Sequence, residues 1–158
     1  MGIAKTRVRT SFMIIVLIGL GVFVVVQARN FLVKRIYQGQ VQDIEHEIRI
    51  YKQLNDTNVE LWSGDNDLKQ IASLKDKIQQ LSPASDELKK SRQHLLKALE
   101  YAYQAQEESG LTISQINLEE DQDKFTRPKE YLEKADGEAT NSTEYLEKFE
   151  KAHQELFQ

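Results

Sequence analysis

The hydrophobic positions of the chain begin with one long uninterrupted run. No charged residue occurs from Thr10 to Ala28, a stretch of 19 residues made mainly of Ile, Leu, Val, Phe and Met. As a helix, this run would be about 28 Å long, close to the roughly 30 Å thickness of bilayer hydrocarbon. The pattern therefore predicts a transmembrane helix at residues 10–28, a signal anchor, after a short basic tail at residues 1–9.

The apolar positions after this run repeat with a helical period and not with the alternation of a strand. Five of them follow one another at spacings of 4, 3, 4 and 3 residues: Tyr37, Val41, Ile44, Ile48 and Tyr51. Such spacing places all five on one face of a helix. We expect this helix to continue directly from the transmembrane helix and to end near Trp62, where residues 63–66 (Ser-Gly-Asp-Asn) form a stop signal.

Three further helical segments are expected. The second helix should cover residues 67–81, and the third should begin with Ser82 as N-cap and Pro83 as first helical residue. The third helix should end at residues 109–110 (Ser-Gly), because glycine favours a helix C-terminus. Thr112 and Gln115 have the spacing of a capping box for a following segment.

The last segment carries a helical stripe that is interrupted by breakers. Pro128 should either kink this segment or start a new helix, and Gly137 and Asn141 are points where it could open into a loop. The pentapeptide Glu-Tyr-Leu-Glu-Lys at residues 130–134 returns at residues 144–148, two heptads later. The stripe itself is formed by Leu132, Ala135, Ala139, Ser142, Leu146, Phe149, His153 and Leu156.

Together these segments predict an all-α protein. Short turns between long helices favour antiparallel neighbours, so residues 29–158 should form an up-and-down bundle of three to four long helices with coiled-coil-like packing. The small residues in the middle of the last stripe make the predicted core thin. We therefore expect a protein partner or self-association to cover part of the bundle.

Charge is distributed unevenly along the chain. Six of the 21 bases precede the first acid, Asp43, which leaves 15 bases against 25 acids after Ile36 and a net charge of −10 for that part. Because nucleic-acid phosphates repel such a domain, the sequence argues against nucleic-acid binding. Cysteine is absent, so disulfides, thiolate metal sites and cysteine nucleophiles are excluded.

The orientation of the predicted anchor depends on weak signals. Three bases precede the apolar run and three follow it closely, so the charge bias is nearly balanced. A short tail followed by a large C-terminal domain usually leaves the tail in the cytoplasm. We expect a single-pass protein of the cell membrane with a cytoplasmic N-terminus and an extracytoplasmic acidic bundle.

A cleavable signal peptide is the alternative for the N-terminal segment. The bases before the apolar run resemble an n-region, and residues 26–28 (Val-Gln-Ala) fit a small-x-small cleavage pattern ending at Ala28. Against cleavage, the run is long, and Arg29, Lys34 and Arg35 are placed to reach the lipid headgroups. An anchor is favoured, and a secreted helical protein remains the alternative.

No constellation of residues suggests catalysis or metal binding. His46, His94 and His153 lack the spacings of zinc ligands, and the acidic residues 119–123 lack the frame of a calcium loop. No phosphate-binding glycine loop or nucleophile elbow occurs. We therefore expect no catalytic, cofactor-binding or metal-binding residues, and no enzymatic activity.

The sequence thus favours a function based on contacts. Trp62, together with Leu61, is the candidate partner contact, because tryptophan often anchors protein interfaces. The alternative, which its place at the end of the first helix favours, is that Trp62 caps the core of the bundle. We expect an extracytoplasmic scaffold or accessory subunit that binds the lipid bilayer through residues 10–28 and acts through protein–protein contacts. The alternative is a sensor-like helical module that binds a small ligand or a peptide.

Overall fold

The computed structural model is all-helical over the residues that it describes and contains no strand among them. It describes the backbone of residues 3–55, 64–119 and 122–157, and the side chains of residues 20–55, 68–119 and 123–157. The chain divides into two compact units, Met1–Tyr37 and Gln38–Gln158. The second unit is called the bundle below.

The first helix, α1, spans Ile3–Leu54 without a break, so its residues belong to both units. In the N-terminal unit the large apolar side chains from Leu20 to Ile36 are exposed. Over the described part of the chain, no helix offers an apolar stretch long enough to cross a membrane. The side chains of residues 10–19, more than half of the predicted span, lie outside that part.

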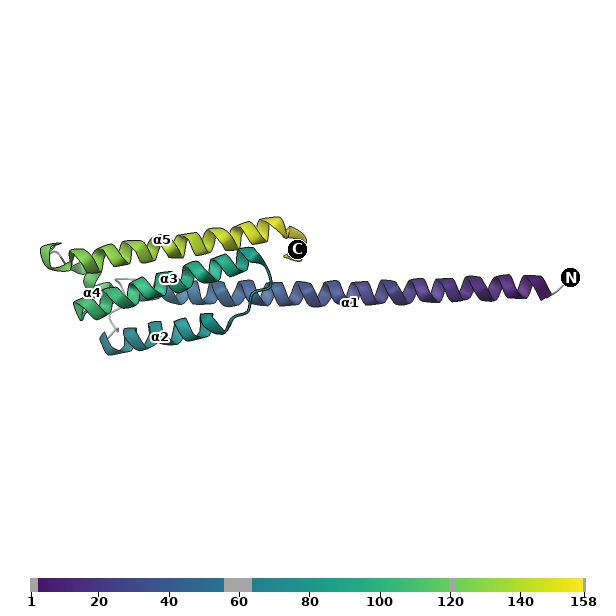
Figure 1. Ribbon diagram of the computed structural model, residues 1–158, viewed down its shortest axis with the longest axis horizontal. Helices are drawn as coiled ribbons and strands as arrows, with labels where there is room; N and C mark the ends of the chain where they lie inside the picture. Colours follow the sequence, from purple (N-terminus) through teal and green to yellow (C-terminus); the bar gives the residue numbers. More distant parts are fainter. Residues whose placement is uncertain (1–2, 56–63, 120–121, 158) are drawn as a thin grey trace. The chain divides into compact units, whose positions relative to one another are not determined.

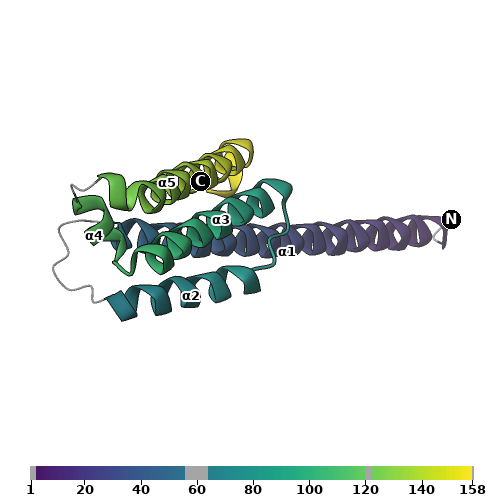
Figure 2. The same ribbon diagram turned by 60° about the vertical axis from the view of Figure 1, so that its left-hand side comes forward.

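In the bundle, helices run side by side in alternating directions. Residues 38–54 of α1 are followed by α2 (Gly64–Gln80), α3 (Asp86–Ser109) and α5 (Gln122–Ala152), and each of these runs antiparallel to the one before it (Figures 1 and 2). The short α4 (Ile113–Leu118) connects α3 to α5, and the 3₁₀ helix η1 (Gln154–Leu156) follows α5. The prediction of an all-helical protein whose helices pack against one another is confirmed.

The core of the bundle consists of the stripes expected from the sequence. On α1, Val41, Ile44, Ile48 and Tyr51 are buried, and α2 contributes Ile71, Leu74 and Ile78. On α5, the small residues Ala135, Ala139 and Ser142 face α3, and the Ser142 hydroxyl donates to the Ser91 carbonyl at 2.8 Å. The Ser91 hydroxyl in turn donates to the Ser142 carbonyl, so two fully buried hydroxyls join the two helices.

The start of α3 differs from the prediction. Its N-cap is Ser85, whose side chain accepts from the Leu88 amide, and the first helical residue is Asp86. Ser82 and Pro83 precede the helix because Gln40 of α1 binds their segment. The Gln40 amide donates to the Ser82 carbonyl, and its oxygen accepts from the Ala84 N–H, both at 3.2 Å. A contact distant in sequence thus moves the helix start by three residues.

Other helix ends follow local chemistry. Gly110 ends α3 in the left-handed region at φ 68°, and Thr112 with Gln115 forms the predicted capping box of α4. The second helix begins at Gly64, three residues before the predicted start.

The structure shows how far α1 and α5 continue within the described residues. The helix α1 ends at Leu54, next to Asn55, whose side chain donates to Asp136 of α5, and the predicted end near Trp62 lies outside the described residues. Gly137 and Asn141 do not open α5, because the buried residues on either side of them pack against α3. The break in α5 lies at Phe125, so Pro128 lies in the first turn of the helical segment that follows. The N–H groups of a first turn have no partner within the helix, so the missing N–H of proline removes no hydrogen bond there.

Candidate functional site

A groove between α1 and α5 is the candidate site of the bundle. It has a volume of about 380 Å³ and is lined by residues of both helices: Glu45, Ile48, Arg49, Lys52, Thr143, Leu146, Glu147 and Glu150. Ile48 and Leu146 are buried and form its apolar floor. The charged residues stand along its walls.

One end of the groove is acidic. Glu45 of α1 approaches Glu147 and Glu150 of α5, whereas the basic residues Arg49 and Lys52 follow further along α1. The pKa of Glu150 is raised, mainly by burial and then by the like charges of Glu45 and Glu147. Three carboxylates therefore repel one another at this end, and a cation brought there would relieve the repulsion.

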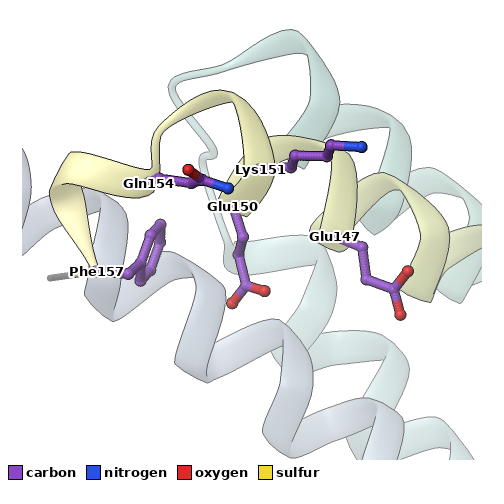
Figure 3. Close-up of a pocket in the computed structure, with 5 residues that line it drawn as sticks. All are labelled: Glu147, Glu150, Lys151, Gln154 and Phe157. Atoms are coloured by element: carbon purple, nitrogen blue, oxygen red, sulfur yellow. The ribbon is translucent and has the colours of Figure 1, made fainter.

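A second pocket, of about 410 Å³, adjoins the groove beside the C-terminal turn. Glu147 and Glu150 line both, and Lys151, Gln154 and Phe157 complete the pocket (Figure 3). In Figure 3 the Glu150 side chain extends from α5 toward α1. The turn is held in place because Gln38 of α1 donates its amide to the Leu156 carbonyl.

The opposite flank of α5, where it packs along α3, carries stacked rings and lysines. The His94 ring of α3 lies parallel to the Tyr145 ring of α5, with centroids 5.4 Å apart. His94 Nδ1 is hydrogen-bonded to the Glu138 carboxylate, and Lys97 approaches the same carboxylate at 3.8 Å. The carboxylate fixes the orientation of the imidazole, as in many polar networks between helices.

The repeated pentapeptide explains why this flank is regular. Tyr131 and Tyr145 occupy the same position of the repeat, and in each case the lysine three residues later lies over the ring. Lys134 is 5.6 Å from the Tyr131 centroid, and Lys148 is 4.7 Å from the Tyr145 centroid. Lys90 of α3 adds a second ammonium 5.4 Å from the Tyr145 ring. Such cation–ring contacts contribute about 0.5–1 kcal/mol each at exposed sites.

The far end of the bundle is joined by a network of polar side chains. The buried Tyr51 donates its hydroxyl to Asp136 Oδ1 at 2.9 Å, and Asn55 donates to the same carboxylate at 3.1 Å. Asn117, at the end of α4, donates in turn to Asn55. Burial, followed by the charge of Asp136 and the hydrogen bond to it, strongly raises the pKa of Tyr51.

Among the side chains that the structure describes, one buried carboxylate oxygen lacks a hydrogen-bond partner. Glu47 is 8% exposed, and its Oε2 has no hydrogen bond. It lies beside a pocket of about 260 Å³ between α1 and α2, which Asp43, Lys77 and Gln80 also line. A buried carboxylate oxygen without a hydrogen bond is costly, so this residue should lower the stability of the bundle.

The structure tests only some of the residues singled out in the sequence. Trp62 and Leu61, the candidate partner contact, lie outside the described residues. His46 is exposed, whereas His153 bonds the Phe149 carbonyl. The flank formed by α3 and α5 was missed, because its residues come from two helices. The pentapeptide repeat was the signal that could have indicated it.

Neither a metal centre nor a known relative defines the site. Among the described residues, no three histidines or carboxylates are grouped so as to hold a metal ion. Comparison of the chain with models of known protein families, with proteins of curated function and with solved structures finds no match in any of the three.

Proposed function

We propose that this chain is a non-enzymatic, single-pass membrane protein whose acidic bundle acts as a scaffold or accessory subunit. In this proposal residues 10–28 cross the bilayer, the N-terminus lies in the cytoplasm, and the bundle lies on the extracytoplasmic side. The bundle contributes through contacts with other proteins or with further copies of the chain.

The observation that supports the proposal is the exposure of apolar side chains on all sides of one helix. Phe23, Val24, Val25 and Val26 follow one another in α1, and they are 60%, 62%, 67% and 46% exposed. Successive helical residues point about 100° apart, so these four side chains face every direction. A helix that is apolar all round has to be surrounded by apolar material.

Lipid fits this requirement better than a partner helix does. A helix that packs against one neighbour needs a single apolar stripe, and its other faces remain polar. Residues 20–28 are too few to cross a bilayer alone, and the sequence adds the uncharged residues 10–19 before them. The basic residues that follow the apolar segment can reach the lipid headgroups at its C-terminal end: Arg29, Lys34 and Arg35.

Alkaline extraction of membranes from cells that express the full chain tests the anchor. The natural chain should stay in the membrane pellet. The double substitution Leu20→Lys with Phe23→Lys should release it, because each lysine near the centre of a span costs about 2.5–3.5 kcal/mol on insertion.

The matched control is Gln42→Lys. It adds a lysine at an exposed position in the part of α1 that belongs to the bundle, and it should leave the chain in the membrane pellet. Extraction of the natural chain together with soluble proteins would refute the anchor.

The mass of the natural chain separates anchoring from secretion. A chain whose N-terminal segment is retained supports the anchor, whereas a mature chain that begins at Arg29 would replace it with the secreted alternative.

A further inference from the structure

Charged residues of opposite sign line one cavity of the bundle without pairing with each other. The cavity, of about 260 Å³, lies between α1 and α2 and is lined by Asp43, Glu47, Lys77, Gln80 and Leu81. Glu47 is 8% exposed, and its buried Oε2 has no hydrogen bond. Lys77 is exposed, and neither Glu47 nor Lys77 takes part in the ion pairs formed among the described side chains.

The helical spacing of these residues builds the two walls of the cavity. Asp43 and Glu47 are four residues apart and share one face of α1, and Lys77 and Leu81 stand in the same relation at the end of α2. Gln40, one turn before Asp43, bonds to the backbone that follows α2 and so holds the walls together. Two carboxylates therefore stand on one wall and an ammonium on the other.

The buried carboxylate of Glu47 costs stability and makes no bond in return. A hydrophobic side chain of similar size would be tolerated better at a position so buried. Residues that break the rules of folding in this way are expected at sites where a ligand supplies the missing partner. A ligand that brings a hydrogen-bond donor to Glu47 would remove the cost on binding.

The charges that line the cavity restrict the chemistry of such a ligand. A simple amine or a metal ion would place its positive charge beside Lys77, and a simple carboxylate would place its negative charge beside Asp43 and Glu47. Like charges brought together in this way weaken binding and exclude the wrong ligand. A ligand that carries both an ammonium and a carboxylate meets an opposite charge at each end.

The size of the cavity limits the ligand further. Because a water molecule takes about 30 Å³ in the liquid, the cavity has room for about nine groups of that size. A small α-amino acid such as alanine fits within this limit, and it carries the two required charges on one carbon atom.

We propose that the cavity between α1 and α2 binds a small zwitterionic amino acid. The ammonium of the ligand lies between Asp43 and Glu47, its carboxylate is bound by Lys77 and the Gln80 amide, and its side chain packs on Leu81. This site belongs to the bundle alone. It adds a ligand to the proposed scaffold and does not depend on the membrane anchor.

Isothermal titration calorimetry of the full chain in detergent micelles tests the site with alanine and its two halves. Ethylamine lacks the carboxylate of alanine, and propionate lacks its ammonium. Alanine should bind at least tenfold more tightly than either half, because each half leaves one charge of the cavity unmatched. Ethylamine that binds as tightly as alanine would overturn the proposal in favour of a plain cation site. No binding of alanine, glycine or serine would overturn it as well.

Substitution of the buried carboxylate tests whether Glu47 holds the ammonium. Glu47→Gln keeps the size of the side chain and removes its charge, so it should weaken alanine binding at least tenfold. Glu45→Gln is the matched control, because it makes the same change at an exposed position of α1 outside the cavity, and it should bind alanine like the natural chain. Equal affinities of the two variants would contradict the proposed site.

Substitution of the exposed lysine provides a second test that does not disturb a buried position. Lys77→Gln should weaken alanine binding and abolish the preference for alanine over ethylamine, whereas Lys69→Gln, at another exposed position of α2, should change neither. A preference retained in Lys77→Gln would refute the assigned role.

The same two variants show whether Lys77 itself pairs with Glu47 in solution. Without amino acid, Lys77→Gln and Lys69→Gln should unfold at the same denaturant concentration, because neither lysine has a partner in an ion pair. A lower midpoint for Lys77→Gln alone would mean that Lys77 fills the site, and the proposal would be wrong.

Discussion

The hydrogen bond between Tyr51 and Asp136 predicts an alkaline limit to the stability of the bundle. Tyr51 is 1% exposed, and its pKa lies well above the ordinary value of 10.0 because burial, and then Asp136, disfavour the phenolate. In the unfolded chain the same group ionises near its ordinary value. A folded-state pKa that is raised contributes stability in full below pH 10 and loses it as the pH rises further.

The magnitude follows from proton linkage. With an unfolded pKa of 10.0, ionisation of Tyr51 in the unfolded chain lowers the free energy of unfolding by about 0.4 kcal/mol at pH 10 and about 1.4 kcal/mol at pH 11. Tyr51→Phe removes this loss. The same substitution removes a hydrogen bond to a carboxylate, which should cost about 1.5–3 kcal/mol at pH 7. The stability difference between the natural chain and the variant should therefore shrink by about 1.4 kcal/mol from pH 7 to pH 11.

Denaturant titration of the full chain in detergent micelles, followed by circular dichroism at pH 7, 9, 10 and 11, measures this difference. Asp136→Asn is the matched comparison, because it also loses the hydrogen bond to the carboxylate but keeps the buried phenol. It should be destabilised at pH 7 and still lose stability above pH 10. If the free energies of unfolding of the natural chain and Tyr51→Phe differ by the same amount from pH 7 to pH 11, the explanation given for Tyr51 is wrong.

Four further substitutions test the packing, a buried carboxylate and a helix end. Ser142→Ala should lower the free energy of unfolding by about 1 kcal/mol, since it loses its bond to Ser91. Ser142→Leu should lower it by about 3 kcal/mol, since a larger side chain would have to fit at a fully buried position beside Ser91; equal stabilities in denaturant would contradict this packing. Glu47→Leu should raise the free energy of unfolding by about 1 kcal/mol in the same assay, and a loss of stability would mean that its carboxylate has a partner in solution. Gly110→Ala should cost about 1 kcal/mol because of the positive φ, although no atom lies within 4 Å of the added Cβ, and an unchanged midpoint would rule out the left-handed cap.

The helices and their packing could be predicted from the sequence because the spacing of the apolar residues in each helix shows which of its faces is buried. The stripes of α1, α2 and α5 were visible as spacings of 3 and 4, and the ends of α3 and α4 at Gly110 and Thr112 depend on residues within one turn. These features are local, so a single sequence contains all the information needed to place them.

The features that the sequence did not predict depend on contacts between distant segments. Ser82 and Pro83 resemble a helix start in the sequence, but Gln40 of α1 binds the Ser82 carbonyl and the Ala84 N–H. Likewise, the bond from Asn55, just after the end of α1, to Asp136 of α5 cannot be seen in the sequence. The groove between α1 and α5 and the stacked rings between α3 and α5 were missed for the same reason. The rings need His94 from α3, with Lys90 over Tyr145, and the groove needs Glu45 from α1, so neither exists before the helices pack.

The central claim is that the acidic bundle is held by the membrane on its extracytoplasmic side. The most direct measurement uses the full chain with the single substitution Gln93→Cys, an exposed position of α3, in intact cells treated with a membrane-impermeant maleimide. The account predicts that the membrane-bound chain is labelled before the cells are permeabilised, to the same extent as afterwards. Labelling that appears only after permeabilisation, or a labelled chain found only in the medium, would contradict it.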